Sequence, residues 1–113
     1  MESTSNDLLR GALDLLILKV LSTSELHGWD ISKRIHVVSG DRILVKQGSL
    51  YPALHRLELK NFIDSEWGVS EAGRSAKFYR LTKKGKAQLE REVEAWLSFA
   101  DSVSSILSLK GVD

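Results

Sequence analysis

The chain has 113 residues, of which 42% are hydrophobic and 27% charged, a length and composition typical of one folded domain. It contains no cysteine, which excludes disulfides, thiolate metal sites and cysteine nucleophiles. The formal net charge is only +1, but twelve Lys and Arg stand against five Asp and Glu between Lys33 and Lys86, and acidic residues predominate from Ala87 onward. Such a basic middle is typical of a phosphate-binding region, and equally of an ordinary solvated surface.

No targeting signal is evident at the start of the chain. Residues 1–7 are polar and lack the basic stretch and long apolar run of a signal peptide. The longest apolar run, residues 15–18, ends at Lys19 and is far shorter than a membrane span. We therefore expect a cytoplasmic protein without a membrane partner.

Two helices are predicted in the first third of the chain. Residues 7–21 carry apolar side chains on more than one face, so we expect burial on most sides, with a second subunit as one candidate cover. After a break at residues 22–28, a second helix is expected over 28–38, where apolar residues recur at i, i+4 and i+7. Gly40 fits the left-handed residue that ends such a helix, and residues 43–45 are expected to form a very short strand.

The third predicted helix has two different faces. Ser49 is its expected N-cap, and Pro52 would then be the third helical residue, where a missing N–H costs nothing. The apolar stripe consists of Leu50, Ala53, Leu54 and Leu57. The opposite, polar and basic face carries Ser49, Pro52, His55 and Arg56.

A β-hairpin is predicted next, because the period changes from helical to alternating. Residues 62–67 and 76–81 read as strands on either side of a turn-forming loop at 69–75. Lys77, Tyr79 and Leu81 fall on one face of the second strand. Arg74 and Lys77 place positive charge on the hairpin.

The last predicted helix begins after its cap, Thr82, and carries an apolar seam with heptad-type 4-3 spacing. The seam consists of Leu89, Val93, Trp96, Ala100, Val103 and Leu107. It could pack on the first helix of the same chain. We favour a homodimer interface, because a helix of about 25 residues spans ~37 Å and outreaches so small a domain. The expected domains are therefore residues 7–82 and a dimerisation helix at 83–108.

The resulting fold class is mainly α with a small β-hairpin, in the order of a winged helix-turn-helix. In such folds the N-terminal part of the recognition helix enters the major groove of double-stranded DNA, and the wing lies on phosphate or the minor groove. Hydroxyls would contact phosphate, and Gln47 or His55 would read a base. Tyr51 could equally cover the edge of the core. The candidate DNA-binding residues are Gln47, Gly48, Ser49, Tyr51, Pro52, His55, Arg74 and Lys77.

Three segments of the chain, residues 27–31, 47–57 and 74–82, resemble the PadR family of transcriptional regulators, and the run GSLYPALHRLE at 48–58 is the most specific. The resemblance extends over about residues 8–107. It implies a compact dimer whose first and last helices exchange contacts, repression at a palindromic operator and, in parts of the family, release by phenolic acids or multidrug-type ligands. Trp29 departs mildly from the pattern, since the family often has tyrosine there.

Other functions are less well supported by the residues. The three histidines lack metal-ligand spacing, so no metal or other cofactor is expected. Ser49 and His55 have no third residue to orient them, and no glycine-rich phosphate loop exists, so an enzyme is not expected. The alternative is a winged-helix protein-interaction module that does not bind DNA. Trp96 is first a dimer-core residue, and by family analogy a candidate site for a small apolar or aromatic effector.

Overall fold

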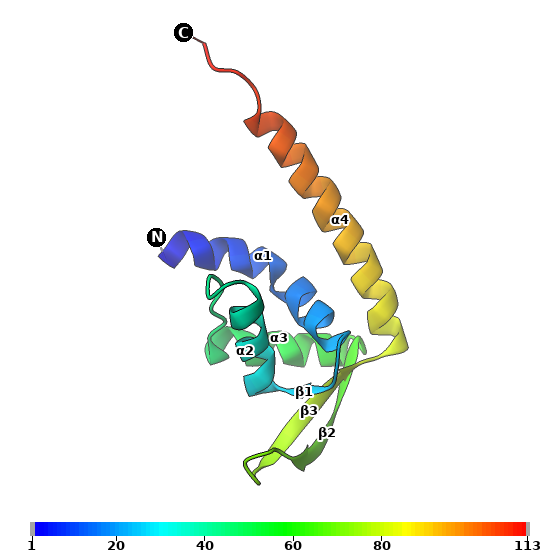
Figure 1. Ribbon diagram of the computed structural model, residues 1–113. Coiled ribbons are helices and arrows are strands. Elements are labelled where there is room, and N and C mark those ends of the chain that lie inside the picture. Colours follow the sequence, from blue (N-terminus) through cyan, green and yellow to red (C-terminus); the bar gives the residue numbers. More distant parts are fainter. Residues whose placement is uncertain (1, 113) are drawn as a thin grey trace.

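The computed structural model describes the backbone of residues 2–112 and the side chains of residues 8–112 (Figure 1). Met1, Asp113 and the side chains of the polar N-terminal segment lie outside the described residues. The elements in chain order are α1 (Glu2–Leu21), β1 (Leu26–His27), α2 (Gly28–Val38), α3 (Gln47–Leu59), β2 (Ile63–Val69), β3 (Ser75–Leu81) and α4 (Lys83–Leu107). The expected fold class, mainly helical with a hairpin wing and a long last helix, is confirmed.

The core lies where α1 meets α2 and α3. Ile17 and Leu18 of α1 are completely buried, as are Ile31 of α2 and Leu50 of α3. The buried stripe of α3 contains the four residues expected from its periodicity. Since α1 packs against α2, α3 and α4, its apolar side chains are needed on more than one face, as the sequence indicated.

The sheet has three antiparallel strands in the order β1-β3-β2. The short strand expected at residues 43–45 is wrong, because no strand forms there and the third strand of the sheet is β1, directly before α2. Residues 43–45 are apolar because Val45 is buried in the core and Ile43 packs against the core. Their hydrophobicity therefore reflects burial in a connecting segment rather than membership of a sheet.

The start of α3 also differs from the prediction. The N-cap is Lys46, without a side-chain cap bond, so Ser49 lies inside the helix and Pro52 lies further in than expected. Proline there removes the N–H that would bond to the Gly48 carbonyl and crowds that carbonyl. Both residues are exposed, so water can solvate the freed carbonyl. The cost of this proline falls on the outer face of the helix and spares the core.

Helix α4 begins at the base of the hairpin and then leaves the body of the molecule. The Thr82 hydroxyl accepts a hydrogen bond from the Gly85 N–H at 3.0 Å, which confirms the expected cap. Figure 1 shows α4 diverging from α1, so that the C-terminal half of α4 extends beyond the body. The principal extents of the molecule are 63 × 30 × 20 Å. Among the described residues, no helix is long and apolar enough to cross a membrane.

Candidate nucleic-acid interface

The outer face of α3 is exposed along its N-terminal half. Gln47, Gly48, Ser49, Pro52 and His55 are all exposed. The side chains of Gln47, Ser49 and His55 make no hydrogen bond to another described residue. Their polar groups are therefore available to a partner outside the chain.

Arg56, which shares the outer face in the sequence pattern, is engaged within the protein. Its guanidinium donates to Asp14 of α1 at 3.1 Å. This pair ties the second half of α3 to α1. The polar side chains of α3 that remain open to a partner therefore extend from Gln47 to His55.

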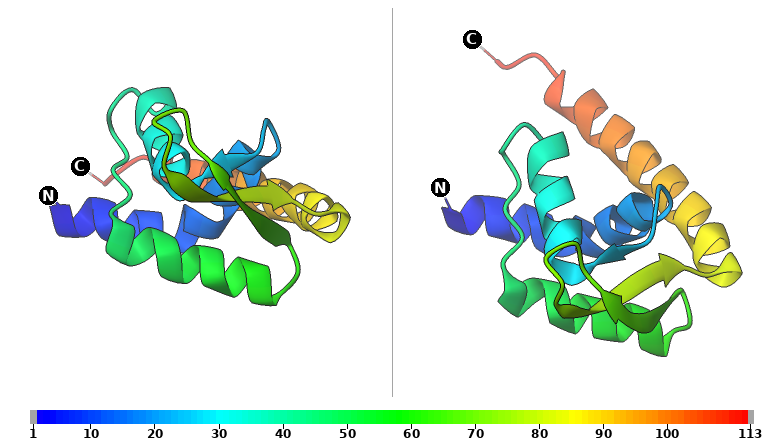
Figure 2. Two further views of the ribbon diagram at one scale, coloured as in Figure 1. Left: turned by 90° about the horizontal axis from the view of Figure 1, so that it is seen from below. Right: turned by 60° about the horizontal axis from the view of Figure 1, so that its bottom comes forward.

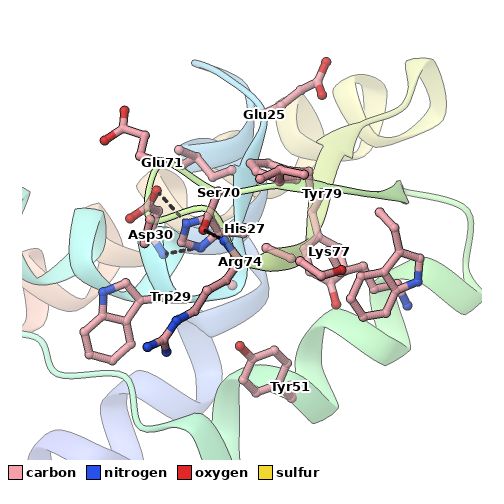
Figure 3. A pocket seen from close by; sticks show the side chains of 18 residues that line it. Glu25, His27, Trp29, Asp30, Tyr51, Ser70, Glu71, Arg74, Lys77 and Tyr79 are labelled. Atoms are coloured by element: carbon pink, nitrogen blue, oxygen red, sulfur yellow. Dashed lines mark hydrogen bonds and ion pairs between the residues drawn. The ribbon is translucent and has the colours of Figure 1, made fainter.

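Tyr51 is partly exposed, at 43%, and its ring lies against Gly28 at the start of α2. It therefore combines the two roles that the sequence left open, because it covers the edge of the body and keeps an accessible edge of its own. Figure 3 shows its hydroxyl directed toward the start of α2, in the space below the wing.

The wing is a regular hairpin with a tight tip. Gly73 takes a left-handed φ of 78°, and its N–H donates to the Ser70 carbonyl at 2.8 Å. The Ser70 hydroxyl also accepts from the Arg74 N–H at 3.3 Å. The Arg74 guanidinium has no hydrogen bond or ion pair with another described residue, and it points across the groove toward Trp29 and Tyr51 (Figure 3).

Lys77 is less free than Arg74. Its Nζ lies 3.7 Å from Oε1 of Glu58 on α3, and 5.8 Å from the centroid of the Tyr79 ring. The other Glu58 oxygen accepts from the Ser65 hydroxyl at 2.6 Å. Burial, and then the Glu58 carboxylate, raise the pKa of the Tyr79 phenol. Glu58 therefore joins α3 to both strands of the wing, a role that the sequence analysis did not find.

A groove of about 1100 Å³ lies between the wing, the first turn of α2 and Tyr51 of α3. Viewed from below, the hairpin tip lies over α2, with α3 to one side (Figure 2). Two tryptophans that were not predicted as site residues line it, Trp29 at 59% exposure and Trp67 at 68%. The sequence analysis missed both residues because it could not show that their side chains are exposed. Periodicity alone does not show that a tryptophan at the edge of a small domain faces solvent.

His27 has a structural role at one end of this groove. Its Nδ1 accepts from the Asp30 N–H at 3.4 Å and so caps α2, while its Nε2 lies 3.2 Å from the Asp30 carboxylate. The ring also meets Phe78 edge-on at 5.5 Å. Within the described residues, no group of three potential ligands is arranged to hold a metal ion.

The seam of α4 divides into two parts. Leu89 is buried in the core of its own chain, and Val93 packs against that core. Further along, Ala100 and Val103 are half-buried, whereas Trp96 is 47% and Leu107 is 78% exposed. Trp96 does not line the groove at the wing. The part of the seam that is open to a partner is therefore its C-terminal part.

The chain matches one family model over residues 17–91, that of the Transcriptional regulator PadR-like family. A sequence relative is the transcriptional regulator Rv3488 of Mycobacterium tuberculosis, which is 35% identical over 83% of this chain and 84% of its own length.

Two solved structures are similar along nearly the whole chain. A PadR family transcriptional regulator from Eggerthella lenta has a TM-score of 0.80 and 32% identity, covering 96% of this chain and 93% of that one. A PadR-like transcriptional regulator from Bacillus cereus has a TM-score of 0.79 and 29% identity, covering 92% of this chain and 99% of that one.

Proposed function

Because this chain belongs to the PadR-like family of transcriptional regulators, we propose that it is a homodimeric repressor that binds double-stranded operator DNA in the cytoplasm. The family consists of regulators and not of enzymes. The observation that carries the proposal is the exposed, unpaired first half of α3 beside the unpaired Arg74 of the wing. These two surfaces flank one groove, as the recognition helix and wing of a DNA-binding domain do.

In this proposal, the first turns of α3 enter the major groove. The exposed N–H groups at the helix N-terminus and the Ser49 and Tyr51 hydroxyls contact phosphate, and Gln47 and His55 reach base edges. A Cβ at Gly48 would meet no atom of the chain within 4 Å, so the open space there suits close approach of a phosphate. Arg74 supplies the charge of the wing, and Pro52 lies on the same outer face.

The dimer part of the proposal rests on residues 83–108, with residues 7–82 as the DNA-binding unit. Large apolar side chains remain exposed on the protruding half of α4 in the single chain, namely Trp96, Leu97, Phe99, Ile106 and Leu107. A monomer would leave this surface in water, whereas a second copy would bury it. The dimer would present two recognition helices to a palindromic operator.

Trp96 is the residue we propose for contact with a small apolar or aromatic effector. It belongs to the exposed part of the α4 seam, so an effector at the dimer interface would contact both subunits. Release of DNA would follow if the effector favoured a different spacing of the two recognition helices.

Selection of bound sequences from random duplexes, followed by measurement of the affinity of variants, tests DNA binding. Tyr51→Ala and Arg74→Ala should each weaken binding about tenfold, the cost of one charge-assisted hydrogen bond. Arg80→Ala is the matched control, because Arg80 lies on the same hairpin but pairs with Asp64 at 2.6 Å and Glu66 at 3.3 Å. Thermal melts establish that all three variants fold.

Unchanged affinity in both test variants would sink the DNA interface. A parent protein that selects no sequence, and instead binds a protein partner with little dependence on salt, would favour the winged-helix interaction module, since phosphate binding weakens steeply as salt rises.

A further inference from the structure

The Tyr51 ring of α3 occupies the space beside Gly28 of α2 in which a side chain at position 28 would lie. Gly28 is the first residue of α2 and is buried. A Cβ at this position would lie 2.6 Å from the Tyr51 hydroxyl oxygen and 2.9 Å from both Cε1 and Cζ of its ring. Any other residue at position 28 would therefore overlap the ring, and Tyr51 would have to move.

The backbone conformation does not require glycine at position 28. Positive φ angles among the described glycines occur at Gly40 and Gly73 and not at Gly28. At Gly11 in α1, by contrast, a Cβ would meet nothing within 4 Å. The structural need for glycine at position 28 is therefore the space occupied by Tyr51.

We propose that Gly28 is a positioning residue for DNA binding, because it lets the Tyr51 ring rest on α2 and so fixes where the Tyr51 hydroxyl meets the DNA backbone. This inference rests on the proposed function. Tyr51 lies on the outer surface of the body and its ring has only two side-chain torsions, so one wall of α2 is enough to select its direction. Tyr51 and Gly28 both line the groove that Trp29 also lines.

The position of the ring can be measured without DNA. The chain has two tyrosines, Tyr51 and Tyr79, so fluorotyrosine labelling gives one ¹⁹F NMR signal for each, assigned with Tyr51→Phe. Gly28→Ala should shift the Tyr51 signal and leave the Tyr79 signal in place. Gly11→Ala, the matched glycine replacement in open space, should move neither. An unmoved Tyr51 signal in a folded Gly28→Ala protein would overturn the proposal.

The consequence for DNA binding is measured by a double-mutant cycle on the selected operator. Gly28→Ala should weaken binding about tenfold in the parent chain, the cost of one displaced phosphate contact. In a Tyr51→Ala background the same change should have less than about a twofold effect, since no ring is left to displace. An equal loss in both backgrounds would show that Gly28 acts without Tyr51, and would refute the inference.

The two arms distinguish this inference from the proposed function. A parent protein that binds no duplex removes both the proposed function and the effect of Gly28 on DNA, whereas the fluorine signals still show whether Gly28 holds the ring. A second outcome is that the parent binds DNA normally, while Gly28→Ala shifts the Tyr51 signal and leaves the affinity unchanged. That outcome leaves the proposed function standing and contradicts the positioning role.

Discussion

The Lys77 ammonium lies 3.7 Å from the Glu58 carboxylate, so a cation of the wing is paired with an anion of α3 within the chain. The side chains of Lys77 and Glu58 are 40% and 32% exposed, which leaves the pair partly screened by water. Arg74, at the tip of the same hairpin, has no such partner among the described residues. Two basic residues that look alike in the sequence therefore differ in the charge that each would offer to DNA in the proposed complex.

This difference predicts unequal effects on the salt dependence of DNA binding. Each phosphate neutralised contributes about 0.9 to the slope of log affinity against log salt. Arg74→Ala should lower the slope by about that amount, and Lys77→Ala should lower it by less, because Glu58 already balances Lys77. Fluorescence anisotropy titrations between about 50 and 200 mM salt measure both slopes.

Glu58→Gln supplies the control for this prediction, since its amide oxygen can still accept from Ser65 while its charge is lost. In that background, Lys77→Ala should reduce the slope as much as Arg74→Ala does. Equal slopes for the two alanine variants in the parent chain would show that the ion pair does not affect binding.

Two acidic substitutions in the exposed seam should separate the proposed dimer. Trp96→Glu with Val103→Glu places two charges in a surface that a second copy would bury, where an unpaired charge is costly. Sedimentation velocity should then show monomers at concentrations where the parent is dimeric. Ser98→Glu with Ser105→Glu is the matched control, because these exposed residues have the same spacing on the opposite side of α4. If the variant with both seam substitutions still sediments as a dimer, the interface lies elsewhere.

An effector at Trp96 should change tryptophan fluorescence and release DNA at the same concentrations. Phenolic acids and planar multidrug-type dyes are the compounds to screen. Trp29 and Trp67 line the groove at the wing, so Trp96 is monitored in a variant with both replaced by phenylalanine. In the otherwise unchanged chain, Trp96→Leu should abolish the response to a compound that frees the parent from DNA. Full release of DNA from that variant would rule out Trp96 as the contact.

Gly85→Ala should destabilise the protein by about 3 kcal/mol or more, because a Cβ there would overlap the backbone oxygen of Phe62, which cannot rotate away as a side chain would. Gly85 lies in the first turn of α4, where the Thr82 N–H also donates to Phe62 at 3.1 Å. Urea unfolding at one fixed protein concentration measures the loss, since the stability of a dimer depends on concentration. Gly11→Ala, in open space on α1, should lose no stability. Equal midpoints for the two variants would show that the start of α4 tolerates a side chain.

The sequence was most informative where one periodic pattern decides the outcome. The apolar stripe of α3, the alternation of the wing strands, the Thr82 cap and the left-handed Gly40, whose φ is 69°, all follow from residues close together in the chain. Such features depend on local geometry, so the residue types and their spacing were enough to predict them. The resemblance of residues 48–58 to a family added the function.

The sequence was least informative where distant residues meet. The two-residue strand β1 exists only because Leu26 pairs with Tyr79 and His27 with Phe78, and nothing in its own two residues indicates this. Helix α3 begins at Gln47, before Ser49, and its N-cap Lys46 makes no side-chain cap bond that the residue types could have indicated. The groove and its two tryptophans likewise arise from three elements that are separate in the chain.

The winged helix-turn-helix and its proposed dimer surface were thus determined unequally by the sequence and by the tertiary structure. The sequence by itself determined which faces of α3 and α4 are apolar, because helical periodicity fixes the direction of each side chain. Only the tertiary structure decided what covers them: Leu89 is buried in the core of its own chain, where α4 packs against α1, whereas Trp96 and Leu107 stay exposed. The packing also divided the basic residues of the wing into a paired Lys77 and an unpaired Arg74, since ion pairs form between side chains that only the fold brings together.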